Sequence, residues 1–245
     1  MVGITAAVIA RDEEQHIVAC LETLSWADER LLLDGGSIDR TVELARRLGC
    51  TRVERRLFDN FPCQRNAAMQ MAANDWILFV DADERVTPEL AEEASQAVQS
   101  PEHDGYFVPR FNHIFGKVMR YTGWYPDYQL RLLDRRYGRY DGAVPVHEVV
   151  RLDRGQAGYL RQHLVHYNYQ TLPQFFEKQE RYSEFEAQQL RARGPVRRRS
   201  LLSMPLREFL RRYWQLQGYR DGGHGLLLSL LMAYYVFRRY QKCLT

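Results

Sequence analysis

The sequence is poor in the features that mark secreted and membrane-spanning chains. Its four cysteines, Cys20, Cys50, Cys63 and Cys243, form no C-x-x-C pair and no disulfide-like framework, a pattern typical of a reducing cytosol. The N-terminal residues lack the basic start, apolar middle and small-residue cleavage site of a signal peptide. The longest apolar stretch, Leu226–Phe237, has about 12 residues, whereas a helix that crosses a bilayer needs roughly 20. We therefore expect a cytoplasmic chain without a spanning helix.

Negative charge is scarce at the C-terminal end. The formal net charge of the chain is +3, yet from Gly194 to Thr245 only Glu208 and Asp221 oppose ten cations. These cations are Arg197, Arg198, Arg199, Arg207, Arg211, Arg212, Arg220, Arg238, Arg239 and Lys242. Such an uneven distribution predicts an anionic partner, either nucleic acid or a layer of lipid headgroups.

The apolar residues of the same segment favour lipid over nucleic acid. Leu226–Phe237 places an apolar face beside the arginines, which describes an interfacial helix better than a groove that follows phosphates. The sequence thus predicts a peripheral protein on the anionic inner face of the cell membrane. Two alternatives are a nucleic-acid binder that uses the interleaved tyrosines, and a helix that packs on the rest of the chain with its arginines solvated.

The first hundred residues alternate between strand-like and helix-like segments. Such alternation predicts βαβ units and a parallel sheet with both faces covered. The expected strands are Ile4–Ala10, Arg30–Asp34, Thr51–Leu57 and Trp76–Val80, and the expected helices are Glu14–Leu24, Asp39–Leu48 and Gln64–Ala73. Ligands bind at the carboxyl ends of such strands. The polar segments found there are Arg11–Glu13, Asp34–Ser37 and Asp81–Glu84.

The pattern changes after Pro101. Short aromatic-rich strands predict a mixed-sheet region that builds an acceptor pocket; they are Gly105–Phe111, Val118–Tyr121, Tyr128–Leu133 and Tyr159–His166. A helix is expected from Leu172, and the basic tail looks like two helices separated by Gly222-Gly223. We predict an α/β catalytic domain over residues 1–170 and a helical, basic and amphipathic region over residues 171–245.

Asp81-Ala82-Asp83 follows directly on the apolar strand Trp76–Val80. In extended backbone, residues two apart point to the same side, so the two carboxylates are expected side by side. Such a pair repels unless a cation joins it, and hard divalent ions prefer oxygen ligands. The alternative is that Asp83 and Glu84 serve the start of the helix that follows Thr87.

Several segments together resemble a known enzyme family. Arg11-Asp12-Glu13-Glu14, Asp34-Gly35-Gly36-Ser37, Gln64-Arg65-Asn66 and Asp81-Ala82-Asp83-Glu84-Arg85 occur in the order found in inverting GT-A glycosyltransferases of family two. The later segments Gly123–Asp127, Gln129–Leu132, Val146-His147-Glu148 and His166-Tyr167 are similar to the core β-glucosyltransferases of lipopolysaccharide assembly. Family members usually have Asn where Asp12 stands and often Ser where Gly35 stands.

The resemblance implies a role for each candidate residue. Arg11, Glu13, Asp34, Arg65 and Asp81 would bind the nucleotide sugar, and Asp83 with His166 would hold a divalent metal (Mn or Mg). Each has a plainer alternative: Asp34 would cap its turn through Ser37, Arg65 would be a solvated helix residue, and His166 a packed strand residue.

An inverting transfer also needs a general base for the acceptor hydroxyl. The candidates after the metal motif are Glu148 and Asp127, of which Glu148 is preferred because an acid followed by a histidine resembles the family order. Trp124, Tyr125 and Tyr128 would offer ring faces to a sugar, with core packing as the alternative.

The chain is accordingly predicted to transfer a hexose, with UDP-glucose favoured as donor, to a lipid-linked glycan such as the lipopolysaccharide inner core. A glycan on polyprenyl diphosphate is the competing acceptor. The alternative of a different class is a protein without catalysis that binds nucleotide sugar or nucleic acid.

Overall fold

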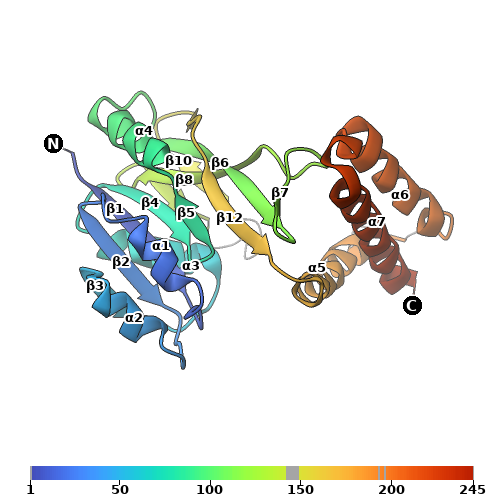
Figure 1. Ribbon diagram of the computed structural model, residues 1–245, viewed down its shortest axis with the longest axis horizontal. Helices are drawn as coiled ribbons and strands as arrows, with labels where there is room; N and C mark the ends of the chain where they lie inside the picture. The colour runs from blue at the N-terminus through green and yellow to red at the C-terminus, as the bar shows by residue number, and fades with distance from the viewer. Residues whose placement is uncertain (1, 142–148, 193, 196, 245) are drawn as a thin grey trace. The chain divides into compact units, whose positions relative to one another are not determined.

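The computed structural model describes residues 2–141, 149–192, 194–195 and 197–244. The chain divides into two compact units (Figure 1). The first comprises residues 1–110 and 128–166, and the second comprises residues 111–127 and 167–245. The second unit therefore contains the C-terminal region from residue 171 and also the segment 111–127, which the sequence placed in the catalytic domain. The boundary predicted at residue 170 stays a prediction.

The first unit is built on the parallel strands that the apolar runs predict. The strands are β1 (Ile4–Ala10), β2 (Glu29–Asp34), β3 (Arg52–Arg55) and β4 (Trp76–Asp81), and they lie in the order β3-β2-β1-β4. The connecting helices are α1 (Ile17–Glu22), α2 (Thr41–Arg47) and α3 (Phe61–Met71). The predicted βαβ alternation is confirmed, although α1 and α2 are shorter than the apolar periodicity indicates.

The sheet continues beyond β4 with antiparallel pairing. Its full order is β3-β2-β1-β4-β8-β6-β12-β5, with β4 antiparallel to β8 and β12 antiparallel to β5. The strands of this part are β5 (Glu84–Val86), β6 (Gly105–Ile114), β7 (Lys117–Val118), β8 (Asp127–Asp134), β11 (Gly158–Tyr159) and β12 (Leu164–Tyr169). A separate hairpin pairs β9 (Gly138–Tyr140) with β10 (Val150–Leu152). The expected mixed sheet is thus confirmed.

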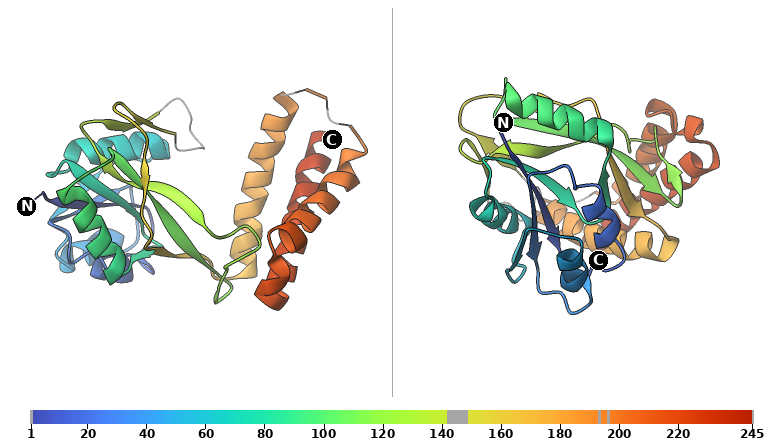
Figure 2. Two further views of the ribbon diagram at one scale, coloured as in Figure 1. Left: turned by 90° about the horizontal axis from the view of Figure 1, so that it is seen from above. Right: turned by 60° about the vertical axis from the view of Figure 1, so that its left-hand side comes forward.

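Each face of the sheet buries its own apolar core because strand residues alternate between faces. Ala6 and Val8 of β1 pack on one face with Leu21 of α1 and with α4 (Pro88–Gln99). Ala7, between them in the sequence, packs on the other face with residues of α3. Helices therefore cover both faces of the sheet (Figures 1 and 2).

The second unit is mainly helical. It contains α5 (Leu172–Ala192), α6 (Ser200–Leu210), the π-helical turn η1 (Arg211–Gln215), the 3₁₀ turn η2 (Gly218–Asp221) and α7 (Gly222–Leu244). Gly222-Gly223 was expected to separate the two tail helices, but it begins α7. The break comes earlier, at Gln217, whose backbone has a positive φ of 54°. Gly222, with a φ of 65°, then directs the chain into α7.

Helix α7 is amphipathic within this unit. Leu228, Tyr235 and Val236 are buried, and Leu228 and Tyr235 share an apolar cluster with Phe175 of α5. The opposite side of α7 exposes Leu230. Within the part of the chain that the structure describes, no helix combines the length and the hydrophobicity that a membrane crossing requires.

Candidate functional site

The carboxyl ends of β1, β2 and β4 meet at one edge of the sheet. Ala10 at the end of β1 lies beside Asp34 of β2, and Ile9 lies beside Asp81 of β4. The polar segment Arg11–Glu13 follows β1 directly. The parallel register therefore brings the three predicted polar strand ends together, all within the first unit.

The loops after β1 and β2 hold each other through side-chain hydrogen bonds to backbone. Ser37 Oγ accepts from the Asp12 N–H at 3.0 Å, and Asp12 Oδ1 accepts from the Ile38 N–H at 2.8 Å. Thr41 Oγ1 accepts from the Glu13 N–H at 2.8 Å. Asp12 has a φ of 56°, a left-handed conformation that Asn and Asp tolerate better than other side chains. Asp12 can therefore replace the Asn typical of the resembled family without disturbing this loop.

Asp34 sits below these loops and is almost fully buried. Its Oδ1 accepts from the Ser37 N–H at 3.0 Å, and its Oδ2 lies 3.9 Å from Arg55 Nε. The turn-capping contact considered as the alternative for Asp34 is thus present. Arg11, by contrast, exposes its side chain. Nucleotide binding by Arg11, Glu13 and Asp34 stays a prediction.

Asp81, the last residue of β4, lies between two arginines. Arg65 Nη2 is 3.1 Å from Asp81 Oδ1, and Arg131 Nη2 donates to Asp81 Oδ2. Burial by itself would raise the pKa of Asp81, but the guanidinium groups of Arg131, Arg65 and Arg110 outweigh it and hold the pKa well below its usual range. Asp81 is therefore ionised at neutral pH.

A second acid, Glu84, completes this arrangement. Its side chain is fully buried, and its Oε1 accepts from Arg110 Nη1 at 3.0 Å and from Arg131 Nη2 at 3.3 Å. Its Oε2 accepts from the Asp81 N–H at 2.9 Å. Arg131 of β8 thus bridges both acids. We call Asp81, Glu84, Arg65, Arg110 and Arg131 the ionic cluster; its three guanidinium groups exceed its two carboxylates by one positive charge.

Arg65 enters the cluster from α3 and is 2% exposed. Its guanidinium lies over the rings of Phe79 and Tyr140, at 5.1 and 5.7 Å from their centroids. Cation–π contacts of this kind stabilise a charge that is withdrawn from water. The alternative of a solvated helix residue is therefore wrong for Arg65.

Asp83 faces a different partner from Asp81. Strand β4 ends at Asp81, and the chain turns through Ala82 and Asp83 before β5 begins. The strand alternation that would set the two carboxylates side by side does not extend to Asp83. Asp83 Oδ2 lies instead 3.4 Å from Nε2 of His166 in β12. The antiparallel pairing of β5 with β12, which sets His166 opposite Glu84, creates this proximity.

The helix-cap alternative for the two acids is also wrong. Helix α4 is capped by Thr87, whose Oγ1 accepts from the Leu90 N–H at 3.2 Å. Glu84 belongs to the ionic cluster, and Asp83 approaches His166. His166 is 8% exposed, so the packed position considered as its alternative is observed along with this proximity.

Of the two candidate bases, Glu148 and Asp127, the structure describes only Asp127. Glu148 lies outside the described residues. Asp127 begins β8 and belongs to the second unit, where its Oδ2 accepts from Asn112 Nδ2 at 3.1 Å. The choice between Glu148 and Asp127 stays open.

The three aromatic candidates have different surroundings. Trp124 packs on the apolar cluster of the second unit, with its ring 6.2 Å from that of Tyr169. Tyr125 stacks on Phe111 at 4.9 Å. Tyr128 is 41% exposed and meets another aromatic side chain edge-on. Core packing thus accounts for Trp124, and Tyr128 leaves the most ring surface open to a sugar.

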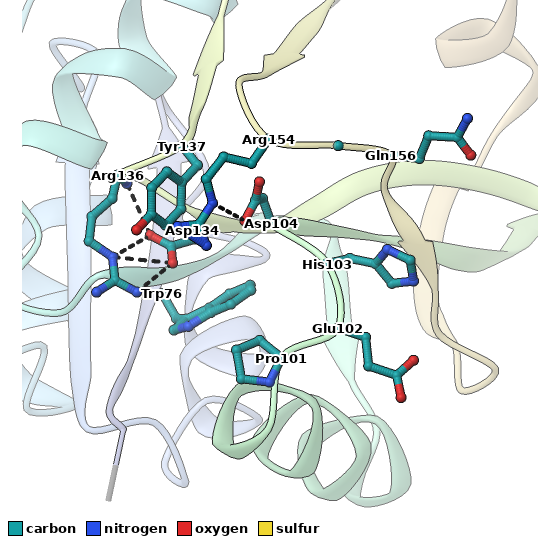
Figure 3. A pocket seen from close by; sticks show the side chains of 11 residues that line it. Trp76, Pro101, Glu102, His103, Asp104, Asp134, Arg136, Tyr137, Arg154 and Gln156 are labelled. Carbon is teal, nitrogen blue, oxygen red and sulfur yellow. Dashed lines mark hydrogen bonds and ion pairs between the residues drawn. The ribbon is translucent and has the colours of Figure 1, made fainter.

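A cavity of about 240 Å³ lies elsewhere in the first unit (Figure 3). Trp76, the first residue of β4, lines it, so it opens at the edge of the sheet opposite to the candidate site. Its charged side chains pair with each other, Arg136 with Asp134 at 2.6 Å and Arg154 with Asp104 at 3.7 Å. Among the predicted site residues that the structure describes, none lines this cavity.

Sequence reasoning missed the contribution of Arg131, Arg110 and Glu84. A signal for Arg131 was present, because a charged residue interrupts the apolar strand Tyr128–Leu133 at a position that an apolar residue would ordinarily fill. A buried arginine requires buried acids nearby, and Glu84 follows the metal motif directly. The sequence does not reveal that β4, β8 and β6 lie side by side, so the acids that pair with Arg131 and Arg110 could not be identified from it.

The mixed sheet with helices on both faces, and with acids at the carboxyl ends of neighbouring parallel strands, is the GT-A architecture of glycosyltransferases. The sequence model of glycosyl transferase family 2 matches residues 5–146. The chain belongs to this family and is a glycosyltransferase.

The chain is similar along most of its length to the lipopolysaccharide core biosynthesis glycosyltransferase LpsC of Rhizobium meliloti. The two are 28% identical over 246 residues, which cover 96% of this chain and 89% of LpsC. Among solved structures, S. aureus TarS matches 96% of this chain with a TM-score of 0.50 at 15% identity, and the match covers 55% of TarS. This likeness supports the fold alone.

A solved complex of glucosyl-3-phosphoglycerate synthase from Mycobacterium tuberculosis with Mn²⁺, uridine diphosphate and glucosyl-3-phosphoglycerate also resembles part of the chain. It is 21% identical, with a TM-score of 0.39 over 45% of this chain and 44% of the synthase. The chain thus spans about half the length or less of these two solved proteins. No residue role is transferred from either.

The ionic cluster generates a testable prediction. Replacing Arg131 by Met removes the bridge between Asp81 and Glu84 and leaves each acid with one guanidinium group in place of two. Breaking a buried ion pair in this way commonly costs about 3–5 kcal/mol in free energy of unfolding. Urea unfolding at pH 7 measures the loss. Arg139→Met is the matched control, because Arg139 and its partner Asp153 are both largely exposed and such pairs contribute about 0–1 kcal/mol.

The loss should depend on pH with a defined sign. A carboxyl group whose pKa is lowered on folding stabilises the fold above its unfolded pKa, about 3.9 for Asp, and this stabilisation disappears as the pH falls through the folded pKa. The gap between the wild type and Arg131→Met should therefore be largest above about pH 5 and shrink below it. An equal loss in both variants, or a gap that widens in acid, would contradict the bridging role of Arg131.

Proposed function

We propose that the chain transfers a hexose, with glucose favoured, from a nucleotide diphosphate sugar to a lipid-linked glycan of the lipopolysaccharide inner-core type, with inversion at the anomeric carbon. Membership of glycosyl transferase family 2 supports the reaction class. The name of the full-length relative LpsC supports the acceptor class, since that protein is described as acting in lipopolysaccharide core biosynthesis. A glycan carried on polyprenyl diphosphate is the second candidate acceptor.

The observation that carries the proposal is the approach of Asp83 to His166 beside the ionic cluster. A carboxylate oxygen from the turn after β4 and an imidazole nitrogen from β12, 3.4 Å apart, form a donor pair suited to manganese and similar divalent ions. In the described residues, no group of three or more His, Cys, Asp or Glu side chains forms a complete metal site. A metal at Asp83 and His166 would therefore take its remaining ligands from diphosphate oxygens and water, as ions that work on phosphates commonly do.

Different residues of the site would serve different steps of the transfer. A bound divalent cation would neutralise the negative charge that develops on the departing diphosphate. The ionic cluster holds Asp81 in a fixed position at the end of β4, and its guanidinium groups would favour an anionic donor nearby. The interlocked loops after β1 and β2 present Asp34 and the backbone around Glu13 to the nucleotide.

Chemistry on the acceptor side requires a base. A bond forms between the acceptor oxygen and the anomeric carbon as the bond from that carbon to the diphosphate breaks. The acceptor hydroxyl gives its proton to a carboxylate, for which Glu148 is the first candidate and Asp127 the second. Tyr128, whose ring is exposed, is the aromatic side chain best placed to contact a sugar.

The donor is identified by incubating the purified chain with UDP-glucose, UDP-galactose, UDP-N-acetylglucosamine and GDP-mannose. We expect slow hydrolysis that needs Mn²⁺ or Mg²⁺ and is fastest with UDP-glucose, and faster consumption when core lipopolysaccharide is added. An enzyme inert toward every donor, with and without acceptor, would exclude the proposed reaction. Faster turnover on a polyprenyl-linked glycan than on core lipopolysaccharide would favour the second acceptor class.

Asp83 and His166 are tested by substitution. Asp83→Asn should lower transfer at least about a hundredfold, because several kcal/mol of charge stabilisation depend on the metal, and nucleotide affinity should stop responding to Mn²⁺. His166→Ala should shift the metal-activation curve to higher metal concentration. Thermal midpoints measured in parallel separate binding from stability, and His163→Ala serves as a nearby control. Wild-type turnover that persists in excess chelator would refute the metal site.

The two candidate bases are distinguished by isosteric variants. Glu148→Gln and Asp127→Asn each keep the size of the side chain and remove the proton acceptor. Loss of a general base commonly slows turnover about a hundred- to ten-thousand-fold. We expect that fall in Glu148→Gln, with donor affinity little changed. Near-normal turnover in Glu148→Gln combined with collapse in Asp127→Asn would assign the base to Asp127.

A further inference from the structure

Helix α6 exposes a row of large apolar side chains. Leu202, Leu206 and Leu210 recur every fourth residue, and Trp214 continues the row into η1. Leu202 is 75% exposed, and Leu206 and Trp214 are each 60% exposed. Residues three and four apart share one face of a helix, so these side chains form a continuous stripe. Such a stripe on a surface helix indicates an interaction site.

The same face carries arginines. Arg199 at the start of α6 and Arg207 stand three residues before Leu202 and Leu210, and both are exposed. Arg197 and Arg198 precede them and are exposed as well. We call the docking face the set Arg197, Arg198, Arg199, Leu202, Leu206, Arg207, Leu210 and Trp214. No carboxylate of the described residues lies within ion-pair distance of its four arginines.

Five other cations of the tail pair with glutamates inside the second unit. Glu208 pairs with Arg211 at 2.8 Å and with Arg212 at 2.6 Å, and both bonds stay within the α6–η1 segment. Glutamates of α5 pair with cations of α7: Glu180 with Arg238 and Lys242, and Glu186 with Arg239. Arg220 lies over the ring of Tyr121 and donates to Gln217. In the described residues, four of the five tail arginines without a carboxylate partner therefore belong to the docking face.

The combination of exposed leucines with arginines that have no carboxylate partner indicates which kind of partner binds the docking face. A symmetric contact between two copies of this face would bring like charges together without a carboxylate to separate them. A nucleic acid would match the arginines and leave three exposed leucines against water or phosphate. A bilayer with anionic headgroups matches both, because leucine and tryptophan enter the acyl boundary while arginines reach the phosphates above it.

We propose that the docking face binds the surface of an anionic lipid bilayer, with α6 lying along the headgroup layer. We assign this contact to the cytoplasmic side, because the cysteine pattern of the sequence is typical of a reducing compartment. The inference concerns a surface of the second unit alone (Figure 2) and holds for any acceptor. It goes beyond the proposed reaction, since it names the partner that holds the enzyme where lipid-linked substrates are found.

Liposome flotation with the full-length protein tests the proposal. Vesicles contain either phosphatidylcholine alone or phosphatidylcholine with a third of phosphatidylglycerol. The wild type should float with the anionic vesicles and much less with the neutral ones. Replacing Arg197, Arg198, Arg199 and Arg207 together by Ser should lower the partition coefficient about fivefold for each arginine, hence several-hundred-fold in all. Replacing Leu202, Leu206 and Leu210 by Ser should lower it at least about tenfold.

A matched variant separates the docking face from net charge. Replacing Arg46, Arg47, Arg139 and Arg161 by Ser removes the same number of exposed arginines from the first unit. It should keep most of the flotation of the wild type. Arg211 and Arg212 stay unchanged in every variant, because their loss would remove the ion-pair partners of the partly buried Glu208. Thermal midpoints close to that of the wild type verify that each variant is folded.

Four results would overturn the proposal. One is a wild type that stays at the bottom of the gradient with anionic vesicles, and another is an equal loss of flotation in the matched variant. A third is a wild-type dimer in sedimentation that dissociates when the leucines are replaced, which would assign the face to a second copy of the chain. The fourth is retention on duplex nucleic acid, without flotation, that the arginine variant abolishes.

Discussion

The bridge that Arg131 forms between Asp81 and Glu84 is the constraint on which the candidate site depends. Arg131 comes from β8, the acids come from the end of β4 and the start of β5, and Arg65 and Arg110 approach from α3 and β6. Five elements are thus tied to one point. Because unpaired charges are costly in a buried place, each element must keep its register for the others to be satisfied. The ionic cluster therefore fixes the turn that carries Asp83.

That turn explains why two neighbouring acids have separate surroundings. Asp81 is neutralised from within the protein, whereas Asp83 lies on the far side of the turn, near His166. A pair of carboxylates that shared one environment would raise each other's pKa. Here the arginines hold Asp81 apart from Asp83, so the two acids do not share one environment.

The sequence allowed the parallel strands and the polar residues at their ends to be predicted, but not the turn after β4 or the partner of Asp83. Apart from Thr5, the runs Ile4–Ala10 and Trp76–Val80 are apolar because both faces of those strands are covered. The strands, their parallel order and the polar residues at their ends could therefore be predicted from the sequence. The turn at Ala82-Asp83 was missed because alternation was extended past the end of β4. The approach of His166 to Asp83 depends on antiparallel pairing between β5 and β12, which are far apart in the chain. Local periodicity carries no information on such pairing.

In the C-terminal tail, the amino-acid composition does not show which cations are paired with acids. Ten cations against two acids suggested one basic surface, yet about half of these cations are bound to glutamates of α5 and α6. In the proposed bilayer contact, the remaining arginines would act by their number and their proximity to the headgroups, so the loss of any one would have a small effect. The arginines of the ionic cluster act by position, because each satisfies a particular buried oxygen. The same residue type thus specifies geometry in the first unit and attraction in the second, and single substitutions should affect the first unit far more than the second.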